Sequence, residues 1–255
     1  VRAFTDENVV REGSSNPKSD LEIIETELVM ADFQTLEKQK DPGNTPDKEL
    51  KKRWEVVTKL RDAVEKGIPA REVELSSEEA KLARELSLLT MKPIIVALNV
   101  DEEDLSESAD LEEKYSKEFD LEKDAVVAIS AKTESQLAGL NPEEEKEYLA
   151  DLGVEKSGLE RLIKKAFSTL GLITFLTAGE KEVRAWTINK GISAQEAAGV
   201  IHTDFEKNFI KADVVNFEDF VRLGWKRAKD EGKVRSEGRE YIVKDGDVIE
   251  FKIGA

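Results

Sequence analysis

Two short polar motifs with the chemistry to read a nucleotide base each follow a run of apolar residues. The run 94–98 ends in Asn99-Val100-Asp101-Glu102, and the run 125–129 ends in Ser130-Ala131-Lys132. The Asn99 amide offers both a hydrogen-bond donor and an acceptor. That pair suits adenine, whose edge presents an N6 donor beside the N7 acceptor. We therefore expect a base pocket built from these two loops.

The neighbouring side chains are candidates to complete this pocket. Val100 can stack on the ring and present its backbone to it. The Glu102 carboxylate can accept a hydrogen bond from the N6 amine, or it can stay solvated. Ser130, Ala131 and Lys132 would bring backbone N–H groups and a Lys stem to the other edge of the base. Phe4 is a further candidate to close the pocket, with core packing as the alternative.

The elements that must position these loops are two short strands. Continuous apolar runs of this length are typical of strands buried on both faces of a parallel sheet. The residues 1–4 read as the end of another strand. In open α/β sheets ligands bind beyond the carboxyl ends of the strands, which is where both polar motifs stand.

The same motifs resemble a known family. Asn-x-x-Glu followed by Ser-Ala-Lys looks like the base-reading loops of P-loop GTPase-like proteins, most of which carry Asn-Lys-x-Asp. Val100 in place of the Lys and Glu102 in place of the Asp resemble the Obg-like ATPase (YchF) family, which prefers ATP. The stretches 177–188 and 201–207 are similar to that family's TGS domain.

The resemblance implies an ATP-binding, ribosome-associated ATPase that uses Mg²⁺. No Gly-x-x-x-x-Gly-Lys-Ser/Thr sequence occurs in the chain, and that loop supplies the phosphate cradle and a metal ligand. We expect the family's phosphate loop and metal ligands to precede Val1, the chain to be truncated, and these residues alone to hydrolyse nothing. The alternative function is a non-enzymatic RNA-, ribosome- or protein-binding module that uses the TGS domain and a helical arm.

The expected fold is α/β: a partial P-loop NTPase-type parallel sheet with an inserted helical hairpin, followed by a β-grasp (TGS) domain. Its expected parts are residues 1–29 with 90–171 for the nucleotide-binding domain, 30–89 for the arm, and 172–255 for the TGS domain. The arm is either a partner-contacting element or a structural insertion without chemistry.

Local signals place the helices and strands of these parts. Capping patterns predict helix starts at Ser19 with Glu22, at Thr45 with Pro46, at Ser76 with Glu79, and at Asn141 with Pro142. In the last third, 173–177 and 183–188 are predicted to form a hairpin, and helices are predicted over 193–200 and from Asn216. The stretches 241–243 and 248–253 are predicted to form a closing hairpin around an Asp-Gly turn.

Charge is distributed unevenly. The net charge is −16, yet 172–255 holds 14 basic and 15 acidic residues, which leaves −15 on the remainder. An acidic body repels nucleic-acid phosphates. We therefore expect a ribosomal RNA contact on the TGS domain, and no DNA binding. Alternatively, the negative charge of the body serves only to keep the protein soluble. The candidate contact is a basic cluster, with a solvated face as its alternative: Lys226, Arg227, Lys229, Lys233, Arg235 and the neighbouring Arg239.

The remaining signals favour ordinary roles. The acidic run 101–113 is predicted to be a solvated helix face and not a metal site, and the single His202 is predicted to be a packed or capping residue. The chain has no cysteine, and it shows neither an apolar run of about 20 residues nor a signal-peptide pattern. We expect a cytoplasmic protein without membrane or disulfide chemistry.

Overall fold

The computed structural model describes residues 1–4, 16–179 and 182–254. The chain divides into two compact units, residues 1–165 and 166–255, and each is described by itself. No helix among the described residues is long and apolar enough to cross a membrane.

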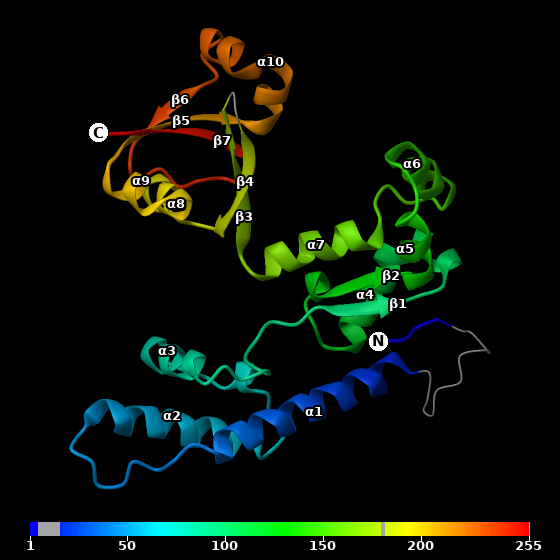
Figure 1. Ribbon diagram of the computed structural model, residues 1–255. Helices are drawn as coiled ribbons and strands as arrows, with labels where there is room; N and C mark the ends of the chain where they lie inside the picture. The colour runs from blue at the N-terminus through cyan, green and yellow to red at the C-terminus, as the bar shows by residue number, and fades with distance from the viewer. Residues whose placement is uncertain (5–15, 180–181, 255) are drawn as a thin grey trace. The chain divides into compact units, whose positions relative to one another are not determined.

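The amino-terminal unit contains a small parallel sheet (Figure 1). Strands β1 (Val96–Asn99) and β2 (Val126–Ile129) pair in parallel, with Val96 opposite Val126 and Asn99 opposite Ile129. The first residues extend this sheet on the other side of β1, because Arg2 bridges Asn99 and the Ala3 N–H donates to the Asn99 carbonyl at 2.8 Å. Both predicted buried strands are therefore confirmed, as is the strand character of the chain start.

Helices surround this sheet. They comprise η2 (Glu102–Glu107), α4 (Ser108–Glu118), η3 (Lys123–Ala125), α5 (Ala131–Leu137), α6 (Pro142–Asp151) and α7 (Gly158–Thr169). The predicted start of α6 is confirmed, because Asn141 and Glu144 form a capping box in front of Pro142. The core under the sheet includes the fully buried Leu98 and Val126.

The helical arm consists of α1 (Pro17–Glu37), α2 (Lys48–Val64), η1 (Ala70–Glu72) and α3 (Ser77–Glu85). The predicted Ser76–Glu79 capping box before α3 is confirmed. Two predicted caps are wrong: α1 is capped by Asn16 and α2 by Asp47. Both are strong capping residues, and Asn16 precedes Pro17, whose fixed φ is well suited to the first helical position.

Helix α1 belongs to two cores. Leu21 packs into the core of the sheet, whereas Val29 and Leu36 pack with Val57 and Leu60 of α2 in the core of the arm. The helix runs without interruption through residues 29 and 30, so the expected border lies inside a continuous element.

A buried carboxylate joins the two ends of the arm. Asp32 on α1 is 1% exposed and accepts hydrogen bonds from the Leu89 N–H, the Thr90 N–H and the Thr90 hydroxyl at 2.6–2.7 Å. The Thr90 Oγ1 in turn accepts from the Ala70 N–H at 2.8 Å. This network fixes the return of the chain toward β1.

The carboxyl-terminal unit is a five-stranded mixed sheet with helices. Its elements are β3 (Leu172–Ala178), β4 (Val183–Asn189), α8 (Ala194–Ile201), α9 (Thr203–Lys207), β5 (Phe209–Asn216), α10 (Phe217–Asp230), β6 (Arg235–Glu237) and β7 (Asp247–Ile253). The strand order is β4-β3-β7-β5-β6, with β3 and β7 parallel and the other pairs antiparallel. The predicted hairpin of β3 and β4 and the helix starts at Ser193 and Asn216 are confirmed.

The predicted closing hairpin is wrong. Strand β7 pairs with β5, where Val214 lies opposite Ile249, while the stretch 241–243 contributes only a bridge from Ile242 to Ser193. The sequence reading missed β5 because charged residues interrupt its apolar pattern. The structure pairs those charges: the Lys211 Nζ lies 2.9 Å from Asp213 Oδ1.

An aromatic cluster forms much of the core of this unit. Phe175 is fully buried, its ring lies 5.9 Å from Phe251, and Trp186 and Tyr241 pack against the same core. Phe217, the first residue of α10, lies outside this core and is 49% exposed. The two sheets together confirm the α/β fold class.

Candidate functional site

The two predicted loops meet beyond the ends of β1 and β2. The Asn99 Oδ1 accepts a hydrogen bond from the Ala131 N–H at 3.0 Å. The Asn99 backbone is already engaged, since its N–H donates to Val1 and its carbonyl accepts from Ala3. Among the described residues no acceptor pairs with its Nδ2, so this amide keeps a donor available while its oxygen ties the loops together.

Ser130 and Lys132 have different roles in the second loop. Ser130 is 2% exposed, and its hydroxyl accepts from the Thr133 N–H at 3.4 Å as the N-cap of α5. Lys132 is exposed, with its Nζ 3.8 Å from Glu102 Oε2. An exposed ion pair of this length contributes little stability, but it brings a charge from each loop to the same place.

Glu102 has a second neighbour that sequence reasoning missed. The Tyr148 Oη on α6 lies 3.2 Å from Glu102 Oε1 and 2.7 Å from Gln136 Oε1. Burial, together with the adjacent Glu102 carboxylate, raises the pKa of the Tyr148 phenol. From the sequence, Tyr148 could be placed on a predicted helix, but its contacts could not be predicted, because its partners lie 46 and 12 residues away along the chain.

Of the other predicted pocket residues, Val100 is placed differently from the expectation. Val100 is 3% exposed in the core of the sheet, and its N–H donates to the Ile129 carbonyl at 2.8 Å. Its side chain therefore contributes to packing and offers no surface for stacking. Phe4 is partly exposed and lies under the Arg2 guanidinium, 4.5 Å from the ring centroid.

The second strand is held by a buried charge cluster. Glu112 on α4 accepts from Arg161 at 2.8 Å, from Lys165 at 2.9 Å and from the Ala128 N–H at 3.0 Å. Its side chain is only 9% exposed, so the prediction of a uniformly solvated acidic run is wrong at this position. Arg161 and Lys165 also donate to the carbonyls of Ala128 and Val126. The cluster thereby fixes β2 just before the Ser130 loop.

Gly158 permits close packing behind the same loop. A Cβ at this position would lie 2.7 Å from the Ile129 side chain, a distance that no alanine could accept without movement. The Gly158 N–H donates to the Glu134 carboxylate of α5 at 2.7 Å. The start of α7 is thus bound directly to the helix that begins with the Ser-Ala-Lys loop.

A buried hydroxyl beside this loop lacks a partner, whereas no metal site is evident among the described residues. Thr133 is 1% exposed, and its Oγ1 makes no hydrogen bond. Such an atom is a candidate to bind water or ligand. Across residues 1–4, 16–179 and 182–254, no group of three or more His, Asp or Glu side chains is placed to hold a metal.

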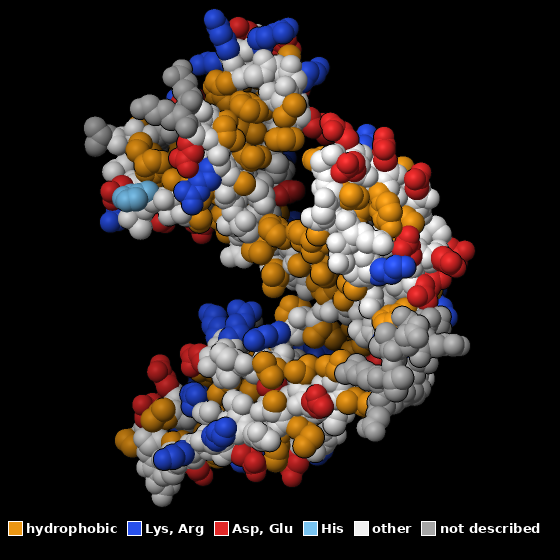
Figure 2. All heavy atoms as spheres, turned by 45° about the vertical axis from the view of Figure 1, so that its right-hand side comes forward, with side chains coloured by type: hydrophobic (Ala, Val, Ile, Leu, Met, Phe, Trp, Pro, Cys, Tyr) orange, Lys and Arg blue, Asp and Glu red, His pale blue; other side chains and the backbone are white. Residues whose placement is uncertain are grey.

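The basic cluster of the carboxyl-terminal unit divides into two groups. Arg235 lies over the Tyr241 ring and donates to its hydroxyl at 3.0 Å, and Arg239 donates to the Phe209 carbonyl. Lys226, Arg227 and Lys229 on α10 and Lys233 just after it are exposed. Figure 2 shows Lys and Arg side chains gathered at the α10 end of this unit. Only the second group is free of such structural contacts within the described part of the chain.

His202 is a capping residue. Its Nδ1 accepts from the Asp204 N–H at 3.2 Å at the start of α9, and its own N–H ends α8 on the Ala198 carbonyl. The prediction of a packed or capping histidine is confirmed.

The fold and the loops define a class of protein. A parallel sheet with Asn-x-x-Glu and Ser-Ala-Lys loops at one edge, followed by a β-grasp unit, is the arrangement of a GTPase-like α/β protein with an appended domain. Residues 172–254 match the family model YchF-GTPase_C, described as "Protein of unknown function (DUF933)".

Relatives extend this match over the whole chain. The chain is 44% identical to the "Ribosome-binding ATPase YchF" of Bacillus subtilis and 42% identical to that of Escherichia coli O157:H7. These alignments cover 99% and 98% of this chain and 71% and 70% of the relatives. The chain therefore belongs to the YchF family.

Solved structures agree with the family assignment. The Schizosaccharomyces pombe YchF GTPase matches with a TM-score of 0.78 at 32% identity, covering 99% of this chain and 70% of that chain. A GTP-binding protein from Pyrococcus horikoshii OT3 matches with a TM-score of 0.54 at 18% identity, covering 98% and 75% of the two chains. The latter supports the fold alone.

Proposed function

We propose that this chain carries the adenine-reading part of a ribosome-associated ATPase. Relatives that share 44% and 42% of its residues are named ribosome-binding ATPases. The observation that carries the proposal is the 3.0 Å hydrogen bond from the Ala131 N–H to Asn99 Oδ1. This contact joins the two polar loops at the sheet edge where α/β proteins bind ligands.

The surroundings of Glu102 favour adenine over guanine. Tyr148 and Lys132 already approach the two oxygens of this carboxylate, so part of its acceptor capacity is used. Adenine presents one donor group on this edge, its N6 amine, whereas guanine carries a carbonyl at position 6 and presents two neighbouring donors, N1–H and the N2 amine. A partly engaged Glu102 suits the base with fewer donors.

Hydrolysis needs groups that these residues do not provide. The sequence holds no phosphate-loop motif, which supplies the phosphate cradle and a metal ligand in such proteins. We propose that residues 1–255 by themselves do not hydrolyse ATP, and that the base loops act together with a phosphate-binding loop and its metal.

The ribosome contact is proposed for the carboxyl-terminal unit. Residues 172–255 are nearly neutral, whereas the remainder carries −15. Lys226, Arg227, Lys229 and Lys233 are exposed cations of the predicted cluster, and the first three of them lie on α10. In the alternative function, a non-enzymatic module, this surface and the helical arm would act without nucleotide.

Nucleotide binding tests the proposal and separates the two functions. In a protein that joins these residues to a relative's phosphate-binding loop, Asn99→Ala should weaken ATP binding by about 1–3 kcal/mol, the typical cost of an unpaired buried group. Asn44→Ala, in an exposed loop of the arm, is the matched control and should leave binding unchanged. Equal affinities for wild type and Asn99→Ala would refute the base pocket.

A further inference from the structure

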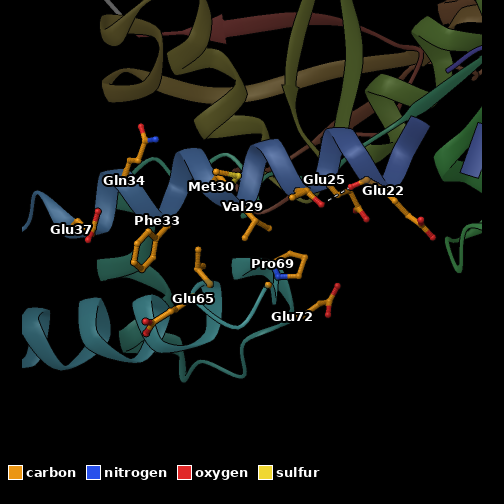
Figure 3. Close-up of a pocket in the computed structure, with 13 residues that line it drawn as sticks. Glu22, Glu25, Val29, Met30, Phe33, Gln34, Glu37, Glu65, Pro69 and Glu72 are labelled. Atoms are coloured by element: carbon orange, nitrogen blue, oxygen red, sulfur yellow. Dashed lines mark hydrogen bonds between the residues drawn. The ribbon is translucent and has the colours of Figure 1, made fainter. Parts of the chain in front are cut away.

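The helical arm carries an elongated groove (Figure 3). It encloses about 650 Å³ and is lined by α1, the end of α2 and the segment that follows α2. Helix α1 contributes one face over four turns: Glu22, Glu25, Thr26, Val29, Met30, Phe33, Gln34 and Glu37. At a rise of about 1.5 Å per residue, this face is about 22 Å long. Such a length suits a helix lying along α1 better than a compact ligand.

The groove has an apolar floor. Figure 3 shows the Val29 and Phe33 side chains pointing from α1 toward the wall that carries Pro69 and Glu65. Val64 completes this floor from α2, and Met30 beside it is 59% exposed. A flexible, exposed thioether adapts readily to the apolar stripe of a partner helix.

The rim of the groove is acidic. The five carboxylates are Glu22, Glu25, Glu37, Glu65 and Glu72, and no Lys or Arg occurs among the described lining residues. Glu25 is neutralised by Arg71, whose Nη2 lies 2.5 Å from its Oε1. Within the described chain, no ion pair involves the other four. The groove therefore combines apolar surface with uncompensated negative charge.

We propose that this groove binds an amphipathic helix of a partner protein, with an apolar stripe flanked by Lys and Arg. The apolar stripe would cover Val29, Met30 and Phe33, and the flanking cations would pair with the rim. Charge complementarity of this kind selects the partner and speeds association. RNA and anionic membranes present phosphates, which four uncompensated carboxylates repel.

The absence of cysteine from the sequence allows a local readout. Met30→Cys places a single fluorophore in the groove, and Glu27→Cys places one on an exposed position of α1 outside the lining. The probe is a synthetic helical peptide of about 16 residues, with Leu at helical spacing and Lys at the other positions. Titration of this peptide should change the fluorescence at position 30 and leave that at position 27 nearly unchanged.

Charge reversal tests the rim. Glu37→Lys with Glu65→Lys and Glu72→Lys should weaken peptide binding at least about tenfold. The matched control reverses the same number of exposed charges on α1 and α2 outside the groove: Glu27→Lys with Glu49→Lys and Glu55→Lys. This control should bind the peptide nearly as tightly as wild type, and a peptide with Gln in place of Leu should bind at least about tenfold more weakly.

Three results would overturn the proposal. Equal weakening in the two triple variants would mean general attraction to an acidic protein. Unchanged affinity of the Gln peptide would mean that the apolar floor is not used. A signal that is the same at positions 27 and 30 would place the peptide elsewhere.

Discussion

The two units of the chain differ in the interactions that stabilise each of them. In residues 1–165, the arm and the sheet have separate cores, and the buried carboxylates Asp32 and Glu112 tie distant segments to them. In residues 166–255, one five-stranded sheet carries two apolar clusters, one that includes Phe175 and one that includes Val248. The carboxyl-terminal unit also has buried carboxylates, Asp213 and Asp247, but the amino-terminal cluster at Glu112 joins a carboxylate to two cations and to the backbone of β2.

The buried charges of the amino-terminal unit also position the base loops. The Ser130 loop follows a strand whose last residues are fixed by Glu112, Arg161 and Lys165, and it begins a helix joined to Gly158. Buried ion pairs need not stabilise a fold more than apolar residues would, but the removal of one partner is costly. The comparison thus predicts a fragile support for the site and a robust appended unit.

The largest change to the protein is the removal of the whole amino-terminal unit. We predict that residues 172–255, expressed separately, fold by themselves, because the sheet and its aromatic core lie within them. Circular dichroism and the dispersion of amide signals would show this. An unfolded segment would contradict both the self-sufficiency of this unit and the domain border that we propose near Gly171.

Within the amino-terminal unit, Glu112→Ala should destabilise the sheet by about 3–5 kcal/mol, because it leaves two largely buried cations without their carboxylate partner. Glu113→Ala is the control, since Glu113 is exposed and pairs only with exposed lysines. Urea denaturation followed through hydrogen exchange in β2 would measure both. Similar values for the two variants would show that the buried cluster has no special role.

The carboxyl-terminal unit should respond less to the removal of a buried polar group. The Tyr241 hydroxyl donates to Asp247 Oδ2 at 2.8 Å, so Tyr241→Phe should cost about 1–3 kcal/mol. Burial, with the Asp247 carboxylate, raises the pKa of Tyr241 to about 12. Because the folded-state pKa lies above the ordinary value of 10.0, this stability should be present below pH 10 and lost as the pH rises through about 12.

Alkaline denaturation would measure that contribution. Wild type should lose stability in this pH window, and Tyr241→Phe should show a flatter profile. Tyr115→Phe, at a tyrosine in the amino-terminal unit, is the control. Identical alkaline profiles for wild type and Tyr241→Phe would contradict the prediction.

The smallest expected effect concerns the charge difference between the units. Changing Lys226, Arg227 and Lys229 to Ala should weaken ribosome co-sedimentation and reduce its log–log salt slope by roughly one for each phosphate that is no longer neutralised. The control removes three exposed lysines from the arm: Lys38, Lys40 and Lys66. Equal effects of the two triple changes would move the proposed contact away from α10.

Much of the fold could be predicted from local signals. The strands at 94–98 and 125–129 are marked by apolar runs, and Ser76 and Asn141 cap helices through partners three residues away. The site was predictable to the extent that polar motifs follow these strands. The Asn99–Ala131 contact could be expected, because parallel strands end at one sheet edge.

The structural features that the sequence did not predict depend on partners that are far away along the chain. Asp32 is satisfied by residues 57 and 58 positions away, and Glu112 by residues 16 to 53 positions away. The sequence alone shows only two more acids in an acidic chain. Strand β5 was missed because Lys211 and Asp213 interrupt its pattern, and only their pairing in the folded sheet accounts for them.

The most direct test of the account is the base preference of the Asn99 and Ser130 loops. The measurement is competition binding of ATP and GTP to the protein that joins these residues to a relative's phosphate-binding loop. We predict that ATP binds more tightly, and that Glu102→Asp, which restores the residue of guanine readers, reduces the difference. Tighter binding of GTP by the unaltered loops would contradict the assignment of this site to adenine.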